Sequence, residues 1–220
     1  MSTHSSNVAH CLVAKENNVV AELIDGIRNF KENTVPAQQE LFDELATGQS
    51  PATLFITCAD SRIDPSLITQ TNPGDIFVVR NAGNIIPRLD ADGSSADGNA
   101  GSIEYAISAL NVQHVVVCGH SSCGAMGGLQ DLDGIADALP SVRRWLEHSE
   151  SLLDTDAADD LDSLIEANTL LQLEHLLSYP GVQEKIDAGE LTLHAWVYDI
   201  GSGDVRAHDG SSFVSLTRDA

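Results

Sequence analysis

The sequence predicts an α/β domain with a mostly parallel β-sheet flanked by helices, an N-terminal helical extension and an antiparallel edge strand. Short apolar, β-branched runs alternate with stretches whose apolar residues recur at helical spacing. A helical segment precedes the first run, and a turn leads into a last short strand. The 220 residues are enough for one domain with a substantial core.

Two helices are expected before the sheet. Residues 17–30 place Val20, Leu23 and Ile27 on one helical face, and residues 36–47 begin with Pro36 and stop before a glycine. We therefore divide the chain into a flexible N-terminus (1–16), a helical arm (17–47) and an α/β domain (48–220). The arm is amphipathic, so it has to cover either its own sheet or a second subunit.

The expected sheet begins with the run TLFITC, which is short and apolar, as a buried parallel strand should be. Turn or loop residues separate the strands that follow, and apolar residues three or four positions apart define the helices between them. The strands are expected at 53–58, 75–81, 113–118 and 190–200, and the helices at 101–110, 123–130, 140–152 and 161–178.

Charge excludes several functions. The chain has 33 acidic and 11 basic residues, a net charge of −22, which suits neither nucleic acid nor an anionic membrane surface. It contains no apolar stretch long enough to span a membrane and no secretory signal pattern. We expect a cytoplasmic protein, and the sequence leaves a microcompartment or an organelle stroma open. We interpret the acidic residues as a solvated surface.

Three soft ligands fall at expected strand ends: Cys58 after the first strand, and His120 and Cys123 after the third. Either these residues bind one metal ion together, or the two cysteines form a disulfide, or the residues do not interact. In a reducing compartment a metal is favoured over a disulfide, and two thiolates with one imidazole suit zinc with a fourth position left open. Of the other two cysteines, Cys118 is expected in the core, and Cys11 is expected to be a free thiol in the N-terminus.

Charged groups stand beside the first thiol. Asp60 and Arg62 follow Cys58 in CADSR, at a strand end where a core would not accept them. An ion pair between Asp60 and Arg62 would keep the Asp60 carboxylate ionised and fix its orientation. The carboxylate could then orient a water molecule bound to the metal.

The motifs C-x-D-x-R and H-x-x-C, together with PGDIFVVRNAGN, GSIEYAISAL and LHAWVYDIGSGDV, resemble the β-class carbonic anhydrases from about Pro36 to about Asp209. The resemblance implies one Zn²⁺ per chain, held by Cys58, His120 and Cys123, with Asp60 and Arg62 as the catalytic dyad. It implies reversible hydration of CO2 to bicarbonate and a proton, by attack of zinc-bound hydroxide. It also implies a homodimer, or a larger assembly of dimers, with active sites at the dimer interface and the arm reaching over the partner.

The resemblance further implies a set of substrate-binding residues, namely Gln49, Phe77, Ala82, Tyr105 and Gly124. Gln49 would reach the site from the partner subunit. The bicarbonate-regulated branch has a tryptophan at the position of Phe55. Phe55 and Gln49 together therefore favour the plant-type branch. Arg80 is expected to form a structural ion pair, and Trp145 to pack in a core or an interface.

Two alternatives stay open. Relatives of this fold hydrolyse carbonyl sulfide or carbon disulfide with the same zinc chemistry. A noncatalytic scaffold, in which zinc only staples the fold, is the other. The Asp60–Arg62 dyad argues against the scaffold, because a purely structural zinc site does not need it. An assay of activity on CO2 distinguishes the carbonic anhydrase from both alternatives.

Overall fold

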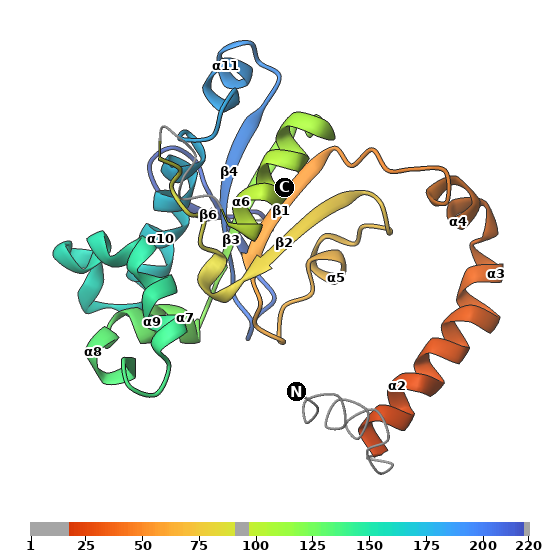
Figure 1. Ribbon diagram of the computed structural model, residues 1–220, viewed down its shortest axis with the longest axis horizontal. Coiled ribbons are helices and arrows are strands. Elements are labelled where there is room, and N and C mark those ends of the chain that lie inside the picture. Colours follow the sequence, from red (N-terminus) through yellow and green to blue (C-terminus); the bar gives the residue numbers. More distant parts are fainter. Residues whose placement is uncertain (1–17, 91–96, 218–220) are drawn as a thin grey trace, which may run out of the picture. The chain divides into compact units, whose positions relative to one another are not determined.

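The computed structural model describes residues 18–90 and 97–217 (Figure 1). The chain forms two compact units, Met1–Gly48 and Gln49–Ala220. Within the described residues, every helix is too short or too polar to cross a membrane. The expected N-terminal segment 1–16 lies outside the described residues.

The first unit is helical, as expected. It comprises α2 (Asn18–Asn29), the π-helical turn η1 (Phe30–Thr34), α3 (Val35–Ala37) and α4 (Gln39–Leu45). The two predicted helices are therefore joined by helical backbone, with Pro36 in the first turn of α3. Apolar side chains of α2, including Leu23 and Ile27, are exposed.

The second unit contains a six-stranded sheet of order β2-β1-β3-β4-β5-β6. The first four of these strands run parallel, and the last two pair antiparallel. The predicted mostly parallel sheet is confirmed, and it gains a strand beyond the expected edge strand. In chain order the strands are β1 (Thr53–Cys58), β2 (Ile76–Asn81), β3 (His114–His120), β4 (Thr192–Tyr198), β5 (Val205–His208) and β6 (Phe213–Ser215).

Helices and single turns connect and flank the strands (Figure 1). The predicted helix 161–178 is the longest of those described, at 16 residues. The helical elements of this unit are α5 (Pro65–Thr69), η2 (Ala82–Asn84), α6 (Gly98–Glu104), η3 (Tyr105–Ala109), α7 (Gly124–Leu129), α8 (Leu132–Ile135), α9 (Pro140–Leu146), η4 (Glu147–Asp154), η5 (Asp156–Asp159), α10 (Leu161–Leu176) and α11 (Val182–Asp187).

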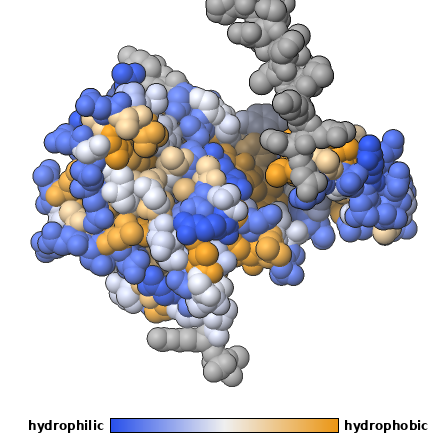
Figure 2. Space-filling model, turned by 90° about the horizontal axis from the view of Figure 1, so that it is seen from below, coloured by the Kyte–Doolittle hydropathy of each residue, from blue (hydrophilic) through white to orange (hydrophobic). Residues whose placement is uncertain are grey.

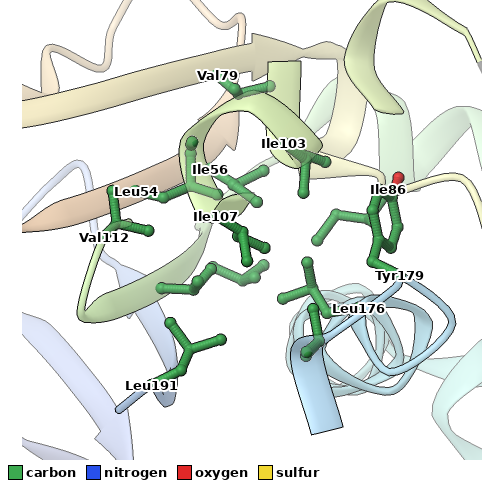
Figure 3. Close-up of a cluster of buried hydrophobic side chains, with 14 of the residues drawn as sticks. Leu54, Ile56, Val79, Ile86, Ile103, Ile107, Val112, Leu176, Tyr179 and Leu191 are labelled. Atoms are coloured by element: carbon green, nitrogen blue, oxygen red, sulfur yellow. The ribbon is translucent and has the colours of Figure 1, made fainter. Parts of the chain in front are cut away.

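Two large buried clusters pack against the sheet. In the larger one, side chains of β1 such as Ile56 pack against Ile103 and Ile107 from α6 and η3 and against Leu176 of α10 (Figure 3). The second cluster gathers around the carboxyl ends of β1 and β3, under α7, α9 and α10. It contains Cys58 and Cys123, so the predicted ligands lie at the margin of a dry core.

The register brings the ends of β1 and β3 together. Thr57 of β1 stands opposite Cys118 of β3, so Cys58 ends one strand just as β3 approaches His120. Ligands in open parallel sheets gather at such carboxyl ends. Gly119 is required here because a Cβ would lie 2.6 Å from Thr169 Oγ1 on α10.

Candidate metal centre

Three side chains converge at this edge of the sheet. Cys58 is the last residue of β1, His120 is the last of β3, and Cys123 is the N-cap of α7. Their ligand atoms all lie within 4.8 Å of one another. Ser122 adopts a left-handed backbone with φ of 56°, and this sharp turn brings Cys123 back toward His120.

The His120 ring is oriented for a ligand. Its Nδ1 lies 2.9 Å from the carbonyl oxygen of Ser121, which can only accept, so Nδ1 carries the hydrogen. Nε2 therefore presents a lone pair, yet it is buried with no hydrogen-bond partner among the described residues. A buried unpartnered nitrogen is costly unless something binds it, and a metal ion would satisfy it.

The two thiols shift each other's pKa in opposite directions. Cys58, Cys118 and Cys123 are all free and buried, so the disulfide alternative is not realised. The pKa of Cys58 is lowered to about 4, first because Cys123 donates a hydrogen bond to it. The pKa of Cys123 is raised, first by the same bond and then by burial. Cys58 therefore loses its proton more readily than Cys123, and metal binding would favour the thiolate form of both.

Asp60 and Arg62 form the pair that the sequence suggests. Arg62 Nε donates to Asp60 Oδ1 at 2.9 Å, and Nη2 donates to Oδ2 at 2.7 Å. The guanidinium holds the pKa of the Asp60 carboxyl well below its usual range. Asp60 Oδ2 lies 4.0 Å from His120 Nε2, so an ionised carboxylate stands at the edge of the ligand cluster.

Backbone groups and Arg80 complete the surroundings. The Gly83 amide donates to Cys58 Sγ at 3.3 Å. Arg80 Nε donates to the Cys58 carbonyl at 3.1 Å, and Nη2 to the Asp60 carbonyl at 2.8 Å. Arg80 makes no ion pair within the described residues, so the expectation for it was wrong: it clamps the backbone that carries Cys58 and Asp60. Sequence reasoning missed the Gly83 amide, since a backbone donor leaves no mark in residue type.

The predicted substrate-binding residues are not all near the cluster. Gly124 directly follows Cys123 as the first residue of α7, and Ala82 follows β2. Phe77 and Tyr105 contact each other, with ring centroids 6.1 Å apart. Phe77 pairs with Leu54, four residues before Cys58, which places it about 13 Å back along the sheet at the usual strand rise. Gln49 is exposed before β1.

The donor set fits zinc. Two thiols and one imidazole are typical zinc ligands, and three protein ligands leave a fourth position for water or substrate. Cys118 is also buried, at 1% exposure, but it lies outside this cluster, in the core where it was expected. Cys11 lies outside the described residues.

A family model described as carbonic anhydrase matches residues 53–205, which hold all three ligands. The solved structure of the β-carbonic anhydrase CcaA superposes with a TM-score of 0.83 at 42% identity, covering 89% of this chain and 98% of that one. The chain belongs to the β-class carbonic anhydrases. The expected fold class and enzyme class are thereby confirmed.

Other carbonic anhydrases are similar along most of their length. The carbonic anhydrase of Synechococcus elongatus is 46% identical over 192 residues, covering 84% of this chain and 70% of the relative. That of Pseudomonas aeruginosa is 45% identical over 204 residues, covering 89% and 91%. One of two tetrameric β-carbonic anhydrases from Sordaria macrospora superposes with a TM-score of 0.68 at 29% identity, covering 90% of this chain and all of that chain.

Proposed function

We propose that this carbonic anhydrase binds one Zn²⁺ through Cys58, His120 and Cys123 and uses it to hydrate CO2 reversibly to bicarbonate and a proton. The observation that carries the proposal is the convergence of three buried ligand atoms within 4.8 Å, one of them the unpartnered His120 Nε2. Bound zinc supplies a Lewis acid that makes water nucleophilic near neutral pH.

The residues around the cluster have separate tasks. Arg62 keeps Asp60 ionised, so its carboxylate can accept a hydrogen bond from the attacking water and aim a lone pair at CO2. Arg62 Nη2 also donates to the Ser122 carbonyl at 3.2 Å, which links this pair to the loop that carries Cys123. The Gly124 amide, next along the chain, is a candidate donor to substrate.

A second copy of the chain would complete the substrate pocket. Phe77 pairs with Leu54, far back along β1 from Cys58, and its ring neighbour Tyr105 is 49% exposed. They and Gln49 would serve the site of a partner, while Ala82 and Gly124 serve their own. The exposed apolar face of α2 also calls for cover, which a homodimer or an assembly of dimers would give. We propose the cytoplasm as the setting, because Cys58 and Cys123 bind metal only when reduced.

The test is CO2 hydration by zinc-loaded protein from about pH 6.5 to about pH 9, with metal content measured in parallel. We expect activity through neutral pH, loss of activity when a chelator removes zinc, and recovery when zinc is returned. The variant Asp60→Asn should keep its zinc and lose most of its activity.

Other outcomes would decide against parts of the proposal. Activity confined to the alkaline end would mean that Asp60 occupies the fourth ligand position at neutral pH, and the plant-type assignment would be wrong. A folded protein with one zinc per chain and no CO2 hydration would overturn the reaction. Carbonyl sulfide and carbon disulfide would then be the substrates to assay, and no turnover of either would leave the scaffold role.

A further inference from the structure

One peptide unit joins the indole of Trp145 to the sulfur of Cys58. Trp145 Nε1 on α9 donates a hydrogen bond of 2.8 Å to the carbonyl oxygen of Ala82. The N–H of the same peptide unit belongs to Gly83, and it donates to Cys58 Sγ at 3.3 Å. The hydrogen bonds thus run from α9, through η2, to the end of β1.

The planarity of the peptide makes this connection mechanically firm. The six atoms of a peptide unit lie in one plane, with the carbonyl and the N–H pointing to opposite sides. Fixing the Ala82 oxygen therefore aims the Gly83 N–H. Accepting a bond at the carbonyl also polarises the amide and strengthens its donation to sulfur.

The next peptide unit is held as well. Asn168 Nδ2 on α10 donates to the Gly83 carbonyl at 3.0 Å, and Asn168 is itself fixed by Ser149 and Gln172. Gly83 has φ of 79°, and an added Cβ would lie 2.9 Å from the end of the Met126 side chain. Carbonyls on both sides of one obligatory glycine are thus bound by side chains from two helices.

We propose that Trp145 is a positioning residue of the metal site, which holds the Ala82–Gly83 peptide so that its N–H donates to the Cys58 thiolate. The inference rests on the proposed metal binding at Cys58. In this role Trp145 fixes the direction of the Cys58 sulfur and stabilises the negative charge on it. Trp145 itself contacts neither the metal nor the substrate. Removing a hydrogen-bond partner of a metal ligand typically lowers metal affinity by about 10-fold or more.

The chain offers a matched control, since its second tryptophan lacks this bond. Trp196 on β4 packs edge-on against Phe55, with ring centroids 6.1 Å apart. Within the part of the chain that the structure describes, its indole nitrogen has no hydrogen-bond partner. Trp145→Phe and Trp196→Phe therefore remove the same atoms, but only the first removes a donor to the peptide.

The experiment compares zinc-loaded wild type with both variants in three measurements. These are the rate of zinc release into excess chromophoric chelator, the sulfur-to-metal absorption band after cobalt substitution, and the melting temperature. For Trp145→Phe we expect zinc release about 10-fold faster and a shifted cobalt band. Trp196→Phe should keep the wild-type release rate and band, whatever its melting temperature.

Equal release rates and equal bands in wild type and Trp145→Phe would overturn the inference while leaving the proposed function intact. A wild type that binds neither metal would instead overturn the proposed function. If Trp145→Phe does not fold, Asn168→Ala tests the same glycine from its other side and should also speed zinc release. Its control is Tyr179→Phe, which removes a hydrogen bond to the Pro87 carbonyl, further along the same segment. Equal release by these two variants would contradict the inference.

Discussion

At the scale of single residues, Arg62 connects the two halves of the ligand cluster. It binds Asp60, which follows the first ligand, through two nitrogens, and it donates to Ser122, which precedes the third. The planar guanidinium serves three acceptors in a fixed geometry. A lysine would carry the same charge but could not form the paired contact.

We therefore expect Arg62→Lys to lower kcat/KM for CO2 hydration by about 10- to 100-fold, with zinc retained. The reason is that Asp60 keeps its charge but loses its direction. Stopped-flow hydration assays with metal analysis check this. Arg143→Lys is the control, because Arg143 pairs with Glu147 on the surface, where such pairs contribute little. Wild-type kcat/KM in Arg62→Lys would contradict the assigned task.

The side-chain cluster of the candidate site and the Asp60–Arg62 pair beside it were predictable from sequence. Cys58, His120 and Cys123 are soft ligands placed at strand ends, and the charges of Asp60 and Arg62 stand out beside an apolar run. The Gly83 amide was not predictable. Its action depends on how a left-handed backbone aims an N–H, and it needs a tryptophan more than sixty positions away.

At the scale of elements, α10 binds the irregular segment after β2 with buried polar side chains. Gln172 Oε1 accepts from the Ile86 amide at 2.7 Å, and His175 Nδ1 donates to the Ile86 carbonyl at 2.7 Å. Both side chains are nearly fully buried. These bonds satisfy backbone groups that have no strand beside them. They hold the segment that contains Gly83.

His175 gives this contact a pH dependence. Burial is the largest cause that lowers its pKa below the ordinary 6.5. The unfolded chain therefore binds a proton more readily, so this contribution to stability is complete above about pH 6.5 and is lost as the pH falls through the folded pKa. Burial lowers the pKa of His194 too, which adds to the same trend.

We expect the free energy of unfolding to fall from about pH 7 to about pH 5, and His175→Gln to reduce that slope. Glutamine keeps a donor for the Ile86 carbonyl but does not titrate. Urea unfolding at several pH values measures this pH dependence of the free energy of unfolding, and His208→Gln on β5 is the control. An unchanged slope in His175→Gln would show that other groups cause the pH dependence.

Long periodic elements were predictable, and short irregular ones were not. Strands β1 to β4 follow from short apolar, β-branched runs, and helix α10 follows from a long stretch rich in leucine. Strand β6 has three residues, and the π-helical turns at 30–34 and 105–109 differ from α-helix only by one residue per hydrogen-bonded turn. The polar inner face of α10 was also missed, because its partners are backbone atoms.

At the scale of the whole molecule, the excess of 33 acidic over 11 basic residues dominates. The face in Figure 2 intersperses hydrophilic side chains with apolar patches. Like charges on a compact surface repel one another, and unfolding relieves that repulsion. Salt screens it, since the Debye length falls from about 10 Å at 0.1 M to about 3 Å at 1 M.

The melting temperature at neutral pH should therefore rise between about 0.1 and 1 M sodium chloride, by about 3 °C for each kcal/mol of repulsion relieved. Scanning calorimetry measures the change. At about pH 4.5 many carboxylates gain protons, and the increment should shrink. A melting temperature that does not rise with salt at neutral pH would mean that local ion pairs outweigh the net charge.

The separation of the metal ligands along the chain has a consequence for biosynthesis. Cys58 meets His120 and Cys123 only after β2, α6 and β3 have folded into the parallel crossover, since β1 and β3 pair side by side. A nascent chain that ends before Cys123 contains Cys58 but lacks one member of the ligand cluster. On the proposed function, metal binding therefore follows the pairing of β1 with β3 and requires more than half of the 220-residue chain.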